Sequence, residues 1–334
     1  MMNLLTNTLL RKVPDHLMSG VMSGEYRVYG SILRSVTSGQ IVGHLQETSR
    51  LSSLLTSSPL DVPGLAFEAV NIVQNEQIKS ALSLMQSLQI ANIALSGISI
   101  GVSIAGTALL MRRISQVEQK IDAILPSISE IAKGVEALKT SMILDDFTRL
   151  RTLASQVEEA WLPSASQSEW TAIARDSHFL ADSFERRARE IGSAGDHQEI
   201  EPFLDAYALA SGLRITARLA AGQDDIARQA ATTHTHTLVA LGGSLRLDRM
   251  TLASMKRAET AATPEWQEKA NELADKLRST VRAARARELA AASCAETLYE
   301  LDRQEISGRE WLEASRDEST SPILFLPVRN QNGS

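Results

Sequence analysis

The sequence has few of the residues and motifs that build disulfides, metal sites or active sites. Cys294 is the single cysteine, which excludes an internal disulfide and a zinc site built from cysteines. It lies in an Ala-rich helical run and is more typical of a small packing residue than of a nucleophile. No Walker loop, GxGxxG loop or HExxH motif occurs. His234 and His236 are the most ligand-like pair, but two residues apart on a helix they point in different directions.

These absences predict that the protein is not an enzyme, and we expect no catalytic residue, no metal site and no cofactor. The net charge of −6 also argues against a nucleic-acid partner, because such proteins normally present a basic surface. Only 4% of the residues are aromatic, whereas Ala, Leu, Ser, Arg and Glu are abundant, which favours helices over sheets. The N-terminal apolar patch is too short for a secretory signal, so we expect synthesis in the cytoplasm without Sec export.

A long stretch without charge, from Ser80 to Met111, is the main feature of the sequence. It covers about 32 residues, although 22% of all residues are charged. Its centre, Ile90 to Met111, has the roughly 22 residues that a helix needs to cross a bilayer. The residues predicted to enter a membrane are Ile90, Ile93, Ile98, Ile100, Val102, Ile104, Leu109 and Leu110.

Small residues in the same stretch predict a helix-packing seam. They recur every three or four positions, which places them on one face of a helix where another helix can approach closely. The seam consists of Ala94, Gly97, Gly101, Ala105 and Ala108. Two interpretations stay open: contact with a lipid membrane, permanent or conditional, and a buried helix in the core of a soluble bundle. A permanent span would leave the segments before and after it on opposite sides of the membrane.

A heptad pattern follows the uncharged stretch. Apolar residues alternate spacings of three and four up to Met142, with charged residues such as Lys120 between them. The predicted oligomerisation positions are Ile114, Val117, Ile121, Ile124, Ile128, Ile131, Val135 and Leu138. Pro126 should kink or restart the helix. The pattern fits an oligomerising coiled coil and, equally, an antiparallel pair with a later helix of the same chain.

Two segments predict strands. Tyr26 to Leu45 reads as a hairpin that turns at Ser38 and Gly39, with Val36 opposite Ile41 and Ile32 opposite Leu45. A lone hairpin is only marginally stable and needs a partner. The other strand-like segment is Pro322 to Val328, so we expect the two ends of the chain to meet in a small sheet.

The remaining sequence predicts a helical bundle. One expected helix ends at Trp161, before Pro163. Further helices are expected over Ser168 to Ile191, Pro202 to Ala221, Asp224 to Leu247 and Pro264 to Asp302. The last helix is locally basic. Its Arg278, Arg282 and Arg285 share one face, which suits anionic lipid, an acidic partner helix or plain solvation.

The fold class that we predict is mainly α, a long-helix bundle with a coiled-coil segment and a small β cap. The expected regions are an N-terminal hairpin region (1–58), the apolar helix with the heptads (59–162), the bundle (163–314) and a tail with one short strand (315–334). The apolar helix at Ile90 to Met111 and the heptads after it resemble, in architecture, the bacterial α-helical pore-forming proteins of the haemolysin E and xenorhabdolysin type. That resemblance implies a toxin-like protein that hides an apolar segment until it meets a membrane.

Two functions are therefore expected. The first is a membrane-perturbing or pore-forming bacterial effector that inserts the apolar helix, oligomerises and becomes membrane-associated when active. The alternative is a soluble coiled-coil scaffold that buries this helix. The expected partners are a lipid membrane and further copies of the chain, and a protein encoded in the same operon is a further candidate.

Overall fold

The computed structural model describes residues 11–50, 114–123, 136–193, 200–256, 263–319, 321 and 323–328. The strands of this part are β1 (Arg11–Lys12), β2 (Tyr26–Tyr29), β3 (Ile32–Ser35), β4 (Ile41–Glu47) and β5 (Ile323–Pro327). Its helices are α2 (Asp15–Ser23), α7 (Glu136–Ala160), α8 (Gln167–Ser193), α9 (Glu201–Ala220), α10 (Asp224–Gly242), α11 (Leu247–Lys256), α12 (Trp266–Arg303) and α13 (Gly308–Asp317). Residues 114–123 form a further helical segment, which we call the 114–123 helix. The protein is therefore mainly α with one small sheet.

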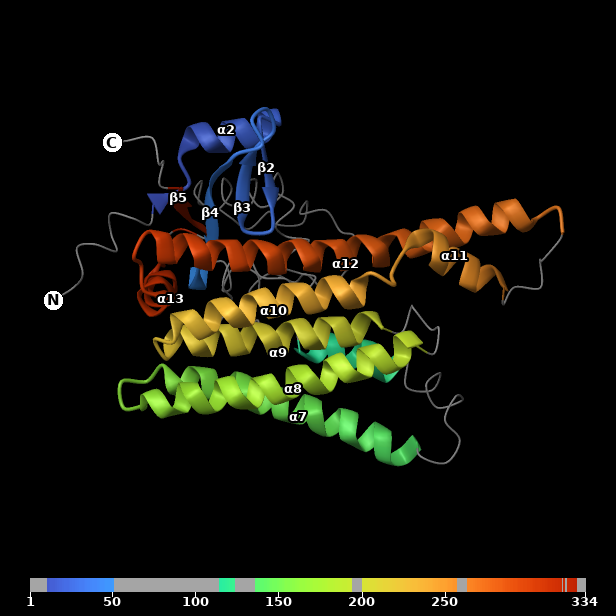
Figure 1. Cartoon of the computed structure of the whole chain (residues 1–334), viewed down its shortest axis with the longest axis horizontal. Helices are drawn as coiled ribbons and strands as arrows, with labels where there is room; N and C mark the ends of the chain where they lie inside the picture. Colours follow the sequence, from blue (N-terminus) through green and yellow to red (C-terminus); the bar gives the residue numbers. More distant parts are fainter. Residues whose placement is uncertain are drawn as a thin grey trace, which may run out of the picture.

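The sheet joins the two ends of the chain, as the sequence predicts. It is antiparallel, with strand order β1-β5-β4-β3-β2, so the C-terminal strand lies between β1 and β4. In Figure 1 the sheet and α2 lie on one side of the long helix α12, and the helical bundle lies on the other. Helix α12 therefore connects the two layers.

The predicted hairpin register is wrong. Ile32 lies opposite His44 rather than Leu45, and Arg34 lies opposite Ile41, with an irregularity after Leu33. The predicted single strand before the turn is also two strands, because the chain reverses between Tyr29 and Ile32. Both errors came from placing one two-residue turn at Ser38 and Gly39, whereas the chain forms a tight turn near Gly30 and a longer loop after Ser35.

The bundle consists of α7, α8, α9, α10 and α12, whose axes run roughly side by side in Figure 1. The four predicted helices between Ser168 and Asp302 are present, but the segment from Asp224 to Leu247 is divided between α10 and α11. Helix α7 ends at Ala160, before Pro163, as predicted. Helix α11 and the first half of α12 extend together beyond the end of the bundle (Figure 1). Helix α2, strand β1 and helix α13 were not predicted.

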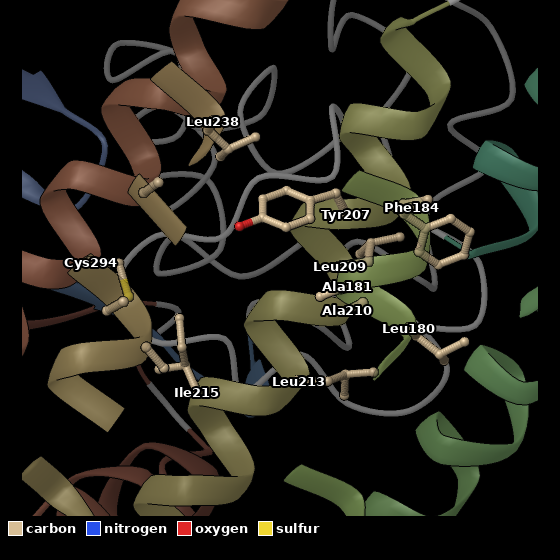
Figure 2. Close-up of a cluster of buried hydrophobic side chains, with 14 of the residues drawn as sticks. Leu180, Ala181, Phe184, Tyr207, Leu209, Ala210, Leu213, Ile215, Leu238 and Cys294 are labelled. Carbon is tan, nitrogen blue, oxygen red and sulfur yellow. The ribbon is translucent and has the colours of Figure 1, made fainter. Parts of the chain in front are cut away.

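The core of the bundle is built from aromatic and aliphatic side chains. Trp170, Trp311, Phe147, Phe184 and Phe203 are fully buried, and the rings of Phe147 and Phe184 lie 5.2 Å apart. Figure 2 shows the part of this core between α8, α9, α10 and α12. Cys294 is buried there, which confirms its packing role, and burial raises the pKa of its thiol to about 12.

Gly30 marks the closest approach of the sheet to α12. Its φ of +60° lies in the left-handed region, and a Cβ at this position would meet Ser293 Oγ and lie 3.0 Å from the Cα of Ala290. We expect Gly30→Ala to lower the free energy of unfolding by about 2–4 kcal/mol, because left-handed strain and overpacking add. Urea unfolding measures this loss.

Gly39→Ala is the matched control, since Gly39 has a φ of +70° but no neighbouring atom within 4 Å of the added Cβ. It should cost only the conformational strain, about 1 kcal/mol. Equal losses in the two variants would contradict the close approach at Gly30.

Candidate functional site

Most of the predicted site residues lie outside the part that the structure describes. This holds for the membrane-insertion set at Ile90, Ile93, Ile98, Ile100, Val102, Ile104, Leu109 and Leu110, for the seam at Ala94, Gly97, Gly101, Ala105 and Ala108, and for the heptad positions Ile124, Ile128, Ile131 and Val135. No helix of the described ranges is long and apolar enough to cross a membrane. The predicted insertion and packing roles therefore stay predictions.

Three of the predicted oligomerisation residues lie on the 114–123 helix. Ile114, Val117 and Ile121 are 0%, 4% and 1% exposed and belong to the core of this chain's own bundle. Leu138 lies in α7, and Met142, at the end of the pattern, is exposed. The burial of the first three residues fits the intramolecular reading of the heptads, and oligomerisation through these positions stays a prediction.

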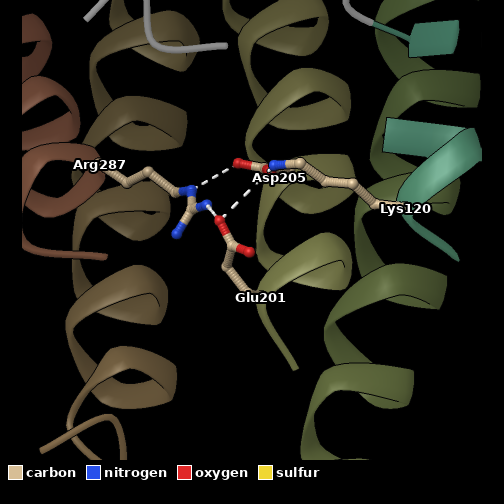
Figure 3. Close-up of polar contacts among 4 residues, drawn as sticks. All are labelled: Lys120, Glu201, Asp205 and Arg287. Carbon is tan, nitrogen blue, oxygen red and sulfur yellow. Dashed lines mark hydrogen bonds and ion pairs between the residues drawn. The ribbon is translucent and has the colours of Figure 1, made fainter. Parts of the chain in front are cut away.

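A buried cluster of four charged side chains lies beside the 114–123 helix (Figure 3). On α12, Arg287 Nε donates to Asp205 Oδ1 of α9 at 2.5 Å, and Arg287 Nη2 donates to Glu201 Oε1 at 2.6 Å. Lys120 Nζ reaches the same two carboxylates, at 3.0 Å from Asp205 Oδ2 and 3.6 Å from Glu201 Oε1. The cluster thus balances two cations with two anions and joins three helices.

Exposure differs strongly within this cluster. The side chains of Arg287 and Asp205 are 2% and 4% exposed, whereas that of Lys120 is 47% exposed. Burial alone would lower the pKa of Arg287, but attraction to Asp205 and Glu201 outweighs it, and the pKa is raised. Burial is likewise the largest single effect on the pKa of Lys120 and would lower it, but the two carboxylates together outweigh burial and raise this pKa. Both cations therefore stay charged at neutral pH.

A second ion pair holds the other side of the 114–123 helix. Arg151 Nη1 of α7 lies 2.8 Å from Glu118 Oε2. The 114–123 helix therefore contacts a cation of α7 through Glu118 and the carboxylates of α9 through Lys120, in addition to its three buried apolar side chains. These contacts hold the 114–123 helix on the bundle.

The cluster of Lys120, Glu201, Asp205 and Arg287 was not predicted from the sequence. Lys120 was expected on a solvated outer face, and Asp205 lies in the apolar run of α9. The available signal was the position of Asp205, four residues after Glu201 in an apolar run. Carboxylates spaced this way share one helical face and need a cation if they are buried. The basic partner, Arg287, is about 80 residues distant, and a single sequence does not connect the two.

A polar seam joins the sheet to α12. Ser31 N donates to Ser293 Oγ at 2.9 Å, and Thr297 Oγ1 lies 3.0 Å from both Ser31 Oγ and His44 Nδ1. The Thr297 hydroxyl donates its proton to the carbonyl of Ser293, so it accepts from His44, which places the proton of neutral His44 on Nδ1. Burial lowers the pKa of His44 to about 4, against the attraction of Glu300.

The basic residues of α12 are largely occupied within the chain. Arg278 pairs with Asp275 and Lys276 pairs with Glu272. Arg285 pairs with Glu288, and its Nη2 also donates to the carbonyl of Gly242 at 2.6 Å, where α10 ends. These contacts favour a solvated and structural role over lipid binding at this face.

His234 and His236, the most ligand-like pair in the sequence, differ in their surroundings. His234 of α10 is buried beside Tyr207 of α9, with ring centroids 5.3 Å apart, whereas His236 is exposed. Burial lowers the pKa of His234 to about 4. Within the described ranges no group of three or more His, Cys, Asp or Glu side chains is arranged to hold a metal ion.

The segment Gly97 to Gly101, GISIG, matches the GxSxG spacing of a hydrolase nucleophile elbow, a match that was not predicted above. It lies outside the described residues, and no strand signal precedes it. Comparison with known proteins gives no further guide: no protein-family model, curated protein or solved structure matches the chain.

Proposed function

We propose that the protein acts on lipid membranes, where the segment from Ile90 to Met111 inserts and several copies assemble. One observation carries this proposal. The chain has about 32 consecutive residues without charge, between Lys79 and Arg112, in a protein whose other regions are regularly charged. The bacterial pore-forming proteins that the sequence resembles use such a segment in this way.

The geometry of the sheet limits how this insertion can occur. Strand β4 lies before the apolar segment and pairs with β5, which lies after it. Ser31 likewise contacts Ser293 and Thr297. A single permanent crossing would separate these partners by a bilayer, so the proposed insertion is conditional, and it either enters and leaves on one side or follows opening of the sheet.

Liposome flotation combined with dye release tests the proposal. We expect the purified, detergent-free protein to float with vesicles and to release their dye. Gly101→Leu should reduce release at least tenfold, because a bulky side chain in the seam prevents close helix packing. Ser99→Leu is the matched control, since on a helix it lies on the side opposite Gly101 and adds the same side chain.

Circular dichroism establishes that both variants are folded. Normal release by Gly101→Leu would contradict the seam, and a wild-type protein that neither floats nor releases dye would contradict the membrane function as a whole.

A scaffold function is the second candidate, because the 114–123 helix, which begins just after the uncharged stretch, lies in the core of the bundle, as a scaffold that buries its apolar segment would require. Ile114, Val117 and Ile121 already pack inside the bundle of their own chain. A scaffold predicts a stable oligomer in solution that is indifferent to lipid. Light scattering of the same sample, without and with vesicles, separates this function from the first.

A further inference from the structure

The 114–123 helix is attached to the bundle through side chains. Ile114, Val117 and Ile121 supply its apolar contacts. Lys120 and Glu118 supply its polar contacts, to α9 and α7 respectively. The residues of the bundle that receive the helix, Arg151, Glu201, Asp205 and Arg287, are called the acceptor surface below.

The chain connection also favours exchange. Residues 124–135 separate the helix from α7, and about 12 residues can reach up to roughly 40 Å when extended. They include Pro126, a residue type that disfavours a continuous helix. An identical helix from another copy would make the same contacts with the acceptor surface, so exchange creates no new interface and leaves no buried charge unpaired.

We propose that the acceptor surface is an oligomerisation site and that in the oligomer it holds the 114–123 helix of a second copy of this chain. This reconciles the heptad pattern, which fits pairing between chains, with the burial of its first residues inside one chain. It deepens the proposed function, because it assigns the surface on which copies assemble. Association by exchange rises with protein concentration and needs no lipid.

The charge pattern makes the acceptor surface specific for this helix. An acidic pair, Glu201 and Asp205, receives Lys120, and a cation, Arg151, receives Glu118. The two contacts lie on different helices of the bundle, so they fix the direction in which the docked helix runs. A helix with the opposite order of charges, or running in reverse, would meet like charges and be rejected.

A pair of charge reversals distinguishes exchange from docking within one chain. Glu118→Arg places two cations together, and Arg151→Glu places two anions together, so each variant alone weakens docking in either arrangement. Exchange between the two variants restores both contacts, because Arg at position 118 meets Glu at position 151 and the native Glu118 meets the native Arg151. Docking within one chain restores neither.

We expect the mixed variants to associate at least about tenfold more tightly than either variant alone, measured by analytical ultracentrifugation without lipid. Circular dichroism of each variant establishes that the bundle is folded. A mixture that behaves as the sum of its separate components would overturn the proposal.

A second measurement needs no variant. Wild-type chains with light and heavy nitrogen are mixed, incubated at high concentration and treated with a carbodiimide, which joins Lys120 to Asp205 or Glu201 by an amide bond with loss of water. Exchange predicts cross-linked peptides that carry one light and one heavy partner. Peptides with only matched labels would overturn it. Exchange without dye release from vesicles would leave this inference standing and contradict the proposed membrane function.

Discussion

Arg287→Met is expected to lower the free energy of unfolding by about 3–5 kcal/mol, because it leaves two carboxylates in the bundle without their main cation. Asp205 is 4% exposed and receives a hydrogen bond from Arg287 Nε. Lys120 remains beside it, but its half-exposed side chain cannot replace the two hydrogen bonds that Arg287 donates. Urea unfolding followed by circular dichroism gives the loss.

The matched control is Arg278→Met on the same helix. Arg278 is half exposed and, among the described residues, pairs with Asp275, three residues before it, so its loss should cost about 1 kcal/mol or less. If Arg287→Met costs no more than this control, the cluster does not hold the bundle together. Replacing Arg287 and Asp205 together by apolar residues should cost less than either change alone, because no charge is then left unpaired.

The helices were predictable because their signal is local. Periodic apolar residues and the prolines and glycines between them were enough to place α8, α9, α12, the end of α7 and the start of α10 to within a few residues. The meeting of the chain ends followed from elimination, since only one strand-like segment was left to pair with the hairpin. Here the pattern and the requirement for a partner strand agree.

Features that depend on contacts between distant residues were not predictable. The predicted hairpin register was wrong because the sequence allows a turn near Gly30 as well as one at Ser38 and Gly39. The position of the turn depends on how Gly30 packs against α12. Helix α13 was missed because its burial comes from Trp311, whose indole Nε1 donates to Gln46 of β4 at 2.9 Å. The charge cluster likewise joins residues from three distant parts of the chain.

Acid is expected to destabilise this fold through two histidines that are buried in the described part of the chain. The pKa values of His44 and His234 are both lowered to about 4 by burial, against an ordinary value of 6.5. Since the unfolded chain binds these protons more readily, stability is unaffected above about pH 7.5 and falls as the pH drops from 6.5 to 4. At pH 4.5 each histidine should cost about 2.5 kcal/mol.

His234→Phe tests this expectation. The ring of His234 packs against Tyr207, and its Nδ1 has no hydrogen-bond partner in the described part of the chain, so an apolar ring can replace it. The free energy of unfolding, measured in urea at pH 7.5 and pH 4.5, should fall by about 2.5 kcal/mol less in this variant than in the wild type. His236→Phe on the same helix is the control, because His236 is exposed.

The two histidines act on different parts of the molecule. His234 lies within the bundle, whereas His44 lies between the sheet and α12. Protonation of His44 on Nε2 leaves its hydrogen bond to Thr297 in place but puts a charge in a buried position, which destabilises the packing of the sheet on α12. His234→Phe should therefore leave the acid-induced loss that comes from His44 unchanged, and this remaining loss is measured as the fall in the free energy of unfolding of the variant between pH 7.5 and pH 4.5. A His234→Phe variant as acid-sensitive as the wild type would show that burial does not keep His234 neutral, and the argument for His234 would then fail.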